Sequence, residues 1–161
     1  LMAVRTTSGT VVVAVRILLL GMCVSLGGCG GAQRQAEQRE ESHLKPLVLF
    51  YGQYTGQHQG QPPANEAELK EFIRSLGPEA LASFPVDTVD ALFISERDGK
   101  PYVVLYGDAA KGNPPGPAGA PVIAYEQEGT GDTRFVGSSM GAVEEVDESR
   151  FRELVPNASA P

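Results

Sequence analysis

Two apolar runs, Ala91-Leu-Phe-Ile-Ser95 and Tyr102-Val-Val-Leu-Tyr106, flank the turn sequence Arg97-Asp98-Gly99-Lys100. An Asp-Gly pair between two such runs is a strong hairpin signal, because glycine readily adopts the left-handed backbone that tight turns need. Before Ala91 the apolar pattern has a helical period, and after it the period is that of strands. This stretch therefore predicts the start of an antiparallel sheet.

Two further strands are expected downstream, at residues 121–125 and 133–136, with a glycine-containing turn over residues 126–132 between them. Residues 141–146 are a candidate for one more strand. The stretch 107–121 is rich in glycine, proline and alanine, so it is expected to be a surface loop. The whole sheet would then have four or five strands.

Before the sheet, an aromatic-rich segment shows helical spacing. Its apolar residues fall at positions i, i+3, i+4 and i+7, and they are Leu47, Phe50, Tyr51 and Tyr54. Pro46 suits the first turn of a helix, and Gly56 suits its end. The short apolar run 47–51 is equally compatible with a strand, so the sequence leaves both alternatives open.

A second helix is better marked than the first. Asn65 is a favourable N-cap residue and Glu68 follows three residues later, which is a capping-box pattern. Gly77 and Pro78 are expected to stop this helix. Its apolar stripe consists of Leu69, Phe72, Ile73 and Leu76.

After the sheet, Asp147 is expected to cap a short final helix that buries Phe151 and Leu154, before a polar tail at residues 156–161. One or two helices, then an antiparallel sheet, then a short C-terminal helix define the α+β class. The predicted domain covers residues 44–155.

The N-terminal region has the layout of an export signal. Arg5 and Arg16 supply positive charge, no acidic residue precedes Glu37, and Ile17–Leu26 is an apolar core of the length typical of a secretory signal. A helix that spans the bilayer is disfavoured, because it needs about 20 apolar residues and Arg16 interrupts the longer run from Val11.

The signal ends in Leu26-Gly27-Gly28-Cys29, which resembles the lipobox of bacterial lipoproteins. The resemblance implies that residues 1–28 are a signal peptide, cut just before Cys29, and that Cys29 carries a diacylglycerol on its sulfur. Two alternatives are an ordinary signal peptide with an incidental cysteine and an uncleaved anchor. Leu1 in place of methionine indicates either a non-standard start or an upstream extension.

Residues 29–43 are polar and lack apolar periodicity, so they are expected to form a lipid-anchored tether or stalk. The residue after the cysteine is Gly30, where aspartate signals retention in the inner membrane under the sorting rule of bacterial lipoproteins. The resemblance therefore implies the cell envelope, at the outer membrane or facing the periplasm.

Charge and cysteine content limit the partners. Cleavage before Cys29 removes two of the 13 Lys and Arg and none of the 20 Asp and Glu, which leaves a net charge of about −9. This charge argues against nucleic acid and against electrostatic docking on anionic lipid. Cys23 would leave with the signal and Cys29 would carry lipid, so no thiol remains for a disulfide or a metal, and no cofactor is expected.

A second resemblance covers residues 44–154. Tyr51-Gly-Gln-Tyr54, His58-x-Gly60-x-Pro62-Pro63 and Asn65-x-x-x-Leu69 are similar to the helix, turn and short helix of type II secretion pseudopilins. The later strands Val122–Glu126, Asp132–Val136 and Met140–Val143 are similar to their sheet. One feature departs from that family: Gly21-Met22 is followed by Leu26 where pilin precursors carry a glutamate, so the prepilin cleavage site is absent.

Residues for catalysis are few. His43 and His58 are expected to be solvated, and their spacing fits no zinc site. The serines stand outside any nucleophile elbow; they include Ser75, Ser83, Ser95, Ser138 and Ser139. Five carboxylates are a candidate cation site near one end of the sheet, but a solvated acidic surface is expected instead; they are Asp87, Asp90, Glu96, Asp98 and Asp108.

Three classes of function follow. The expected one is a lipid-anchored envelope protein that acts as a non-enzymatic binding or structural module and presents its domain to another envelope protein. The alternative is a pseudopilin-like accessory component of a secretion system. An enzyme that uses carboxylates is disfavoured because no constellation of residues supports it.

Overall fold

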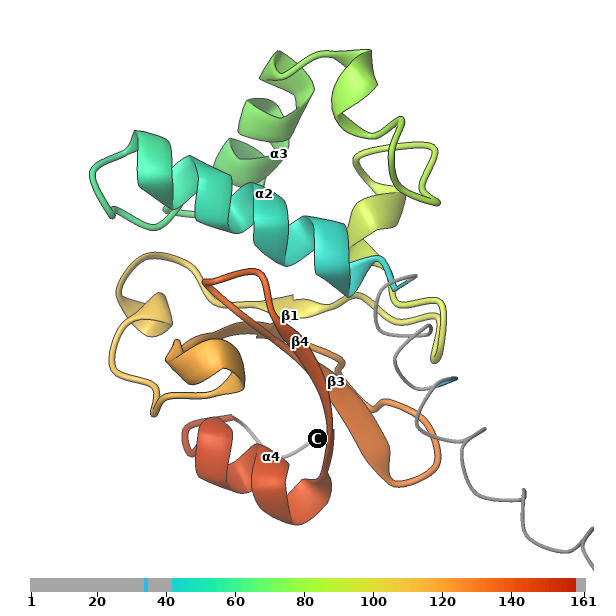
Figure 1. Ribbon diagram of the computed structural model, residues 1–161, viewed down its shortest axis with the longest axis vertical. Helices are drawn as coiled ribbons and strands as arrows, with labels where there is room; N and C mark the ends of the chain where they lie inside the picture. The colour runs from blue at the N-terminus through green and yellow to red at the C-terminus, as the bar shows by residue number, and fades with distance from the viewer. Residues whose placement is uncertain (1–33, 35–41, 159–161) are drawn as a thin grey trace, which may run out of the picture.

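The computed structural model describes Arg34 and residues 42–158. In this part of the chain, helices α2 and α3 precede a four-stranded antiparallel sheet and helix α4 follows it (Figure 1). The predicted α+β class is therefore confirmed. The predicted signal peptide, the lipobox and most of the predicted tether lie outside the described residues. Within the described residues, no helix has both the length and the apolar character needed to cross a membrane.

Helix α2 spans Leu44–Gln57, so the helical alternative holds for this segment and the strand alternative is wrong. Pro46 lies in the first turn, where a backbone N–H would have no partner within the helix. The helix runs through Gly56 and ends near His58, because the left-handed residues that can close it are Gln59 and Gly60. The Gly60 N–H donates to the Thr55 carbonyl at 2.7 Å, which satisfies one of the last carbonyls.

Helix α3 spans Glu66–Ser75 and begins as the sequence predicts. The Asn65 side chain accepts a hydrogen bond from the Glu68 N–H at 3.0 Å. Glu68 does not complete the capping box on Asn65 itself; its Oε2 accepts from the Ala64 N–H at 2.7 Å. Gly77, with φ of 88°, ends the helix as expected. A single 3-10 turn, Pro78–Ala80, follows.

The predicted hairpin is only partly formed. Residues Ala91–Phe93 are a 3-10 turn, and the strand expected at 102–106 shortens to β1, Val103–Val104. Leu92 and Phe93 are both buried in one cluster, whereas a strand would send adjacent side chains to opposite faces. The Asp-Gly turn itself is kept: the Ser95 N–H donates to the Lys100 carbonyl at 2.9 Å. Pro101 has no N–H, and the bridge at this end joins only Ile94 and Pro101.

The remaining strands follow the prediction closely. They are β2 (Val122–Tyr125), β3 (Thr133–Ser138) and β4 (Val143–Asp147), and the sheet order is β1-β2-β3-β4. A bulge lies between Val122 and Ala124 in the pairing of β2 with β3. Because of the extra residue, Val122 and Tyr125 reach one face of the sheet while Ile123 and Ala124 reach the other.

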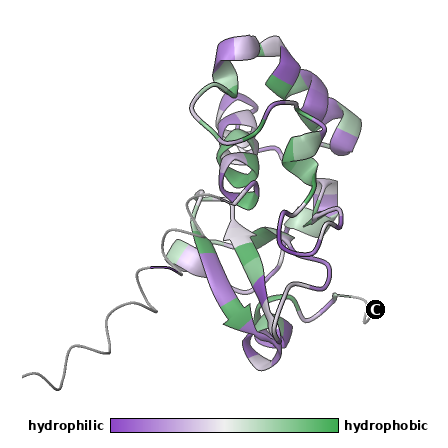
Figure 2. Ribbon diagram, turned by 90° about the vertical axis from the view of Figure 1, so that its right-hand side faces the viewer, coloured by the Kyte–Doolittle hydropathy of each residue, from purple (hydrophilic) through white to green (hydrophobic). Residues whose placement is uncertain are grey.

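The two faces of the sheet carry separate cores. Helix α2 covers one face with Leu44, Leu47, Val48 and Tyr51, against Phe135 and its neighbours. Helix α4, Glu148–Leu154, covers the other face through Phe151 and Leu154, and Asp147 caps it as predicted. Figure 2 shows both hydrophobic and hydrophilic residues along the strands. This pattern fits a sheet whose two faces are buried and whose strand ends are polar.

The loop between β1 and β2 is more than a surface connection, which corrects the expectation for residues 107–121. It contains two 3-10 turns, Gly107–Ala110 and Pro117–Gly119, and Pro117 and Ala120 are buried. A Cβ on Gly116 would meet Val122 Cγ2 at 2.9 Å, so the loop backbone lies directly against the α4 side of the core. Its prolines and glycines fit a tight path across that core.

One glycine sets how closely α2 approaches the sheet. A Cβ at Gly137 in β3 would stand 2.5 Å from Val48 Cγ1 and 3.3 Å from Leu44 Cγ, both on α2. The backbone of Gly137 does not have a positive φ. Its side chain is therefore excluded by packing alone.

Gly137→Ala is expected to destabilise the fold by about 1–3 kcal/mol, because the added methyl pushes α2 away from the sheet. Gly56→Ala is the control: a Cβ there meets nothing within 4 Å, and alanine favours helix by about 0.5–1 kcal/mol. Urea unfolding of the two variants and the parent protein gives both values. Equal stability of the Gly137 variant and the parent would contradict the close approach.

Candidate functional site

The one site residue predicted with a chemical role, Cys29, lies outside the described residues, as do Leu26, Gly27 and Gly28 of the lipobox. Both histidines are described. His58 is exposed, as the sequence predicts, whereas His43 is only partly exposed and is held by its neighbours. His43 lies at the start of α2, and only 14% of its side chain is exposed. Its ring contacts the Ile94 and Pro85 carbonyls and the Glu96 carboxylate.

His58 stands at the opposite end of α2. Its ring stacks on Tyr54 with centroids 3.9 Å apart, and its Nδ1 lies 2.8 Å from the Tyr54 carbonyl. The Tyr54 hydroxyl donates to Glu68 Oε1 at 2.5 Å. This bond raises the pKa of Tyr54 to about 12 and lowers the pKa of Glu68. These groups join the end of α2 to the start of α3.

The five carboxylates of the candidate cation site do not come together as one metal-binding group. Asp90 pairs with Lys70 at 2.8 Å, and this hydrogen bond lowers the pKa of the Asp90 carboxyl. Asp108 pairs with Lys111, Glu96 with His43, and Asp87 is exposed. Among the residues that the structure describes, no three metal-ligating side chains lie together.

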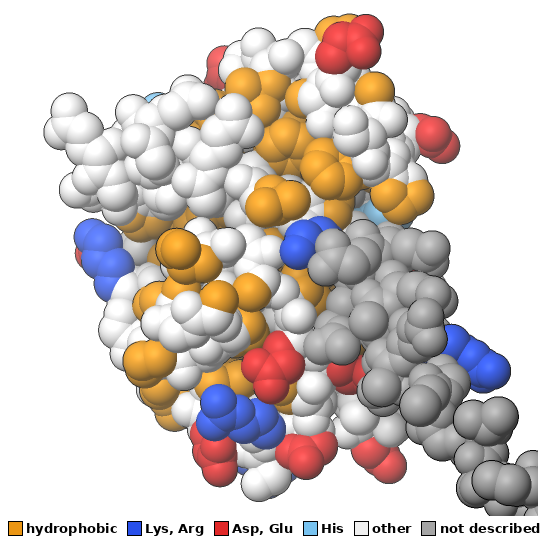
Figure 3. Space-filling view, viewed as in Figure 1, with side chains coloured by type: hydrophobic (Ala, Val, Ile, Leu, Met, Phe, Trp, Pro, Cys, Tyr) orange, Lys and Arg blue, Asp and Glu red, His pale blue; other side chains and the backbone are white. Residues whose placement is uncertain are grey.

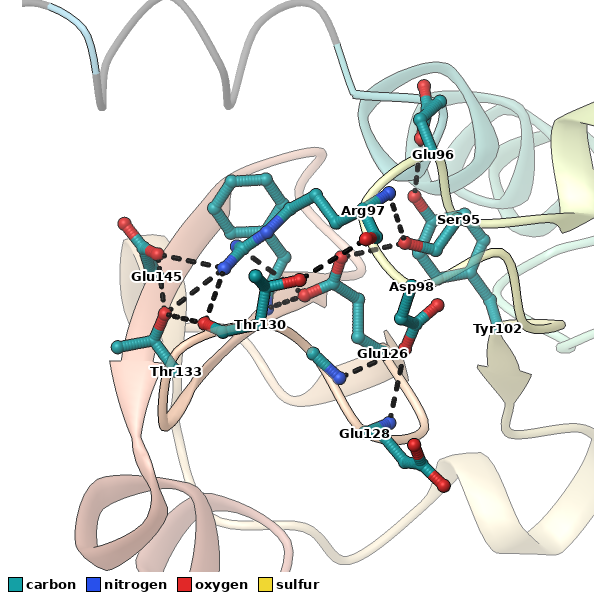
Figure 4. A network of polar contacts seen from close by, with 12 residues as sticks. Ser95, Glu96, Arg97, Asp98, Tyr102, Glu126, Glu128, Thr130, Thr133 and Glu145 are labelled. Carbon is teal, nitrogen blue, oxygen red and sulfur yellow. Dashed lines mark hydrogen bonds and ion pairs between the residues drawn. The ribbon is translucent and has the colours of Figure 1, made fainter.

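The polar cluster that the fold does build centres on Glu126, which immediately follows β2 and is 0% exposed (Figure 4). Its Oε1 accepts from the Ser95 hydroxyl at 2.8 Å, and its Oε2 accepts from the Phe135 N–H at 2.7 Å. Burial raises the pKa of this carboxyl, although both hydrogen bonds and the nearby Arg97 oppose that shift. The donors come from the hairpin turn and from β3.

Arg97 connects Glu126 to the far edge of the sheet. Its Nη1 lies 3.5 Å from Glu126 Oε2, and its Nη2 lies 3.1 Å from Glu145 Oε1 on β4. The same Nη2 donates to the Thr130 carbonyl and to the Thr133 hydroxyl. The guanidinium stands 4.1 Å from the Phe135 ring centroid. One cation thus serves two carboxylates and one aromatic face.

Asp98 completes the cluster by joining two turns. Its Oδ1 accepts from the Lys100 N–H, and its Oδ2 accepts from the N–H groups of Glu128 and Gly129. Burial by itself would raise the pKa of Asp98, but the backbone donors outweigh it and the pKa is lowered. The Asp-Gly turn is therefore tied to the turn between β2 and β3.

This arrangement is suited to holding the structure. Both oxygens of Glu126 are engaged by protein donors, and the Ser95 hydroxyl both donates to Glu126 and accepts from the Arg97 N–H. A substrate would have to displace these hydrogen-bond donors before it could contact the side chain of Glu126 or Ser95. At the α4 end of the domain, acidic and basic side chains lie side by side (Figure 3), and their pairs include Arg134 with Glu148 and Arg150 with Glu153.

Little in the sequence indicates this cluster. Glu126 directly follows the apolar run Val122–Tyr125, which hints that it is drawn into the core. Its partner Ser95 lies 31 residues earlier in the chain, and Glu145 lies on β4, two strands after β2. Only the folded sheet brings them together.

The raised pKa of Glu126 predicts a pH effect on stability. The folded state favours the protonated carboxyl, so this stabilising contribution is complete below the ordinary pKa of 4.5 and is lost as pH rises through the raised folded value. Relative to Glu126→Gln, whose amide does not ionise, the parent protein should therefore lose stability as the pH rises above the ordinary carboxyl pKa of 4.5.

Glu128→Gln is the matched control, because Glu128 is exposed and pairs with Lys100 at the surface. Urea unfolding across the pH range measures all three proteins. The interpretation fails if the parent and the Glu126 variant change in parallel with pH.

Comparison of this chain with protein-family models found no match, and neither the curated proteins nor the solved structures gave a match.

Proposed function

We propose that this chain is a lipid-anchored protein of the cell envelope, in which Cys29 carries the lipid and the domain serves as a non-enzymatic binding or structural module for another envelope protein. The observation that carries the proposal is the motif Leu26-Gly27-Gly28-Cys29 directly after the apolar core Ile17–Leu26. Gly30 favours the outer membrane or the periplasmic face.

The described domain supports this proposal through its boundaries and its chemistry. Ser42 and His43, the last two residues of the stretch 29–43 that would be the tether, already belong to the described fold, and Ser42 is 5% exposed. The carboxylates that might have served acid–base chemistry are separated and engaged with different partners, as Asp90 is with Lys70 and Glu126 is with Ser95. A binding or structural role uses the surface and leaves this interior undisturbed.

The lipid attachment is tested by intact-mass analysis of the N-terminus after expression in a bacterium. The expected parent protein begins at Cys29, carries a diacylglycerol, and enters solution only with detergent. Cys29→Ser should lose the lipid and stay uncut at residue 28, whereas Cys23→Ser, which changes the other cysteine, should behave like the parent. An unmodified Cys29, or a mature chain that still contains Arg16, would contradict the proposal.

A second candidate is an accessory component of a secretion system. The observation that favours it is the packing of α2 against β2 and β3, since the pseudopilin resemblance implies a helix followed by a small sheet (Figure 1). The missing prepilin site at Gly21-Met22 argues against pilus-type assembly. Affinity purification of the protein from detergent-solubilised membranes separates the two: recovery of secretion-machinery proteins favours the second candidate, and recovery of other envelope proteins favours the first.

A further inference from the structure

The two most exposed large hydrophobic side chains of the described residues lie on one surface. Met140 is 72% exposed and Leu49 is 40% exposed. Leu49, on the outer side of α2, contacts the turn between β3 and β4, because a Cβ on Gly141 in that turn would stand 2.6 Å from Leu49 Cδ2. Met140 directly precedes Gly141. We call the exposed side of α2, together with the turn 139–142, the α2 face.

The α2 face carries no carboxylate of its own. The sequence has no Asp or Glu between Ser42 and Asn65 and none in the turn 139–142, although the whole chain has 20 of them against 13 Lys and Arg. The charged residue of α2 is Lys45. In Figure 3, hydrophobic side chains gather over the part of the molecule that holds α2 and α3, and most Asp and Glu side chains lie at the rim or toward α4. An anionic surface therefore repels this side of the domain less than the others.

The tether of the proposed function keeps this face near a bilayer. The lipid would be on Cys29, and residues 30–41 connect it to Ser42, which precedes α2. Even fully extended, that stretch reaches only about 40 Å, so the start of α2 stays within this distance of the membrane. The charged residues of the stretch nearly cancel; they are Arg34, Glu37, Arg39, Glu40 and Glu41.

Contact with a bilayer favours the α2 face over the other sides of the domain. Exposed apolar side chains gain free energy when they leave water for the boundary between headgroups and acyl chains. This gain needs no positive charge, so the net negative charge of the chain does not prevent it where carboxylates are absent. Met140 suits such a surface, because its unbranched side chain adapts to irregular surroundings.

We propose that the α2 face is a membrane-contact surface, with Met140 and Leu49 inserted at the headgroup boundary of the bilayer that holds the lipid of Cys29. This inference rests on the proposed lipid anchor and adds which side of the domain turns toward the membrane. Helix α4, on the opposite face of the sheet, then points away from the bilayer and stays accessible to a protein partner.

The test uses single cysteines that carry an environment-sensitive fluorophore, because the mature chain would have no thiol besides the lipidated Cys29. Met140→Cys places the label in the α2 face. Arg152→Cys is the control on α4, where the Arg152 side chain is 77% exposed. Both full chains are expressed in a bacterium, and intact mass confirms the lipid on Cys29. They are then reconstituted in phosphatidylethanolamine–phosphatidylglycerol vesicles, with and without lipids that carry a quencher on their acyl chains.

The expected result is that the quencher lipids remove most of the fluorescence of the label at 140 and little of that at 152. Equal quenching of the two labels, or none at 140, overturns the membrane contact while the measured lipid leaves the anchor in place. A label at 140 that is shielded from water but not quenched shows that a second copy of the chain covers this face, which also overturns the proposal. An unlipidated Cys29 contradicts the proposed function itself, and the mass measurement identifies that case.

A second pair of variants tests the apolar contact. Leu49→Gln, combined with the label at 140, should reduce the quenching, because one of the two inserted side chains is lost. Ile94→Gln is the matched control, since Ile94 is about as exposed as Leu49 but lies on neither α2 nor the turn 139–142. Circular dichroism confirms that both variants are folded. Equal quenching in the two variants would overturn the proposal.

Discussion

A carboxylate that is wholly removed from water must be supplied with hydrogen-bond donors, and meeting that requirement for Glu126 organises the domain. The donors come from the hairpin turn, through Ser95, and from the neighbouring strand, through the Phe135 N–H. Arg97 then extends the connection to Glu145 on β4. The hairpin turn is thereby held against the sheet with one orientation, which apolar contacts alone would specify less sharply. Leaving any of these groups without a partner costs more than the bond itself contributes.

The packing of α2 and α4 on the two faces of the sheet depends on how closely the backbones approach, as well as on the apolar area that is buried. The bulge in β2 sends Val122 and Tyr125 to the α4 side and Ile123 and Ala124 to the α2 side, so that one four-residue strand serves two cores. On the α2 side, Gly137 leaves space into which Val48 fits. Larger residues at such a position shift a whole helix, because packed interiors have few voids to absorb them.

The start of α2 is where the domain meets the rest of the chain. His43, the residue just before this helix, contacts the carbonyls of Pro85 and Ile94 and the carboxylate of Glu96, which also holds the His43 backbone N–H. The start of α2 is thus tied to the hairpin turn that also carries Ser95 and Arg97.

Local patterns in the sequence determined the α+β class, the N-caps Asn65 and Asp147, and the three later strands. Each depends on residues within a few positions of one another, so periodicity and capping chemistry are sufficient. Local pattern also provides the case for Cys29, which the described structure does not reach. Tertiary structure decided that residues 91–93 form a 3-10 turn, that His43 is held instead of solvated, and that Glu126 meets Ser95 and Arg97. These outcomes depend on partners about 30 to 50 residues away, and burial, which the sequence does not display, determines which distant groups must pair.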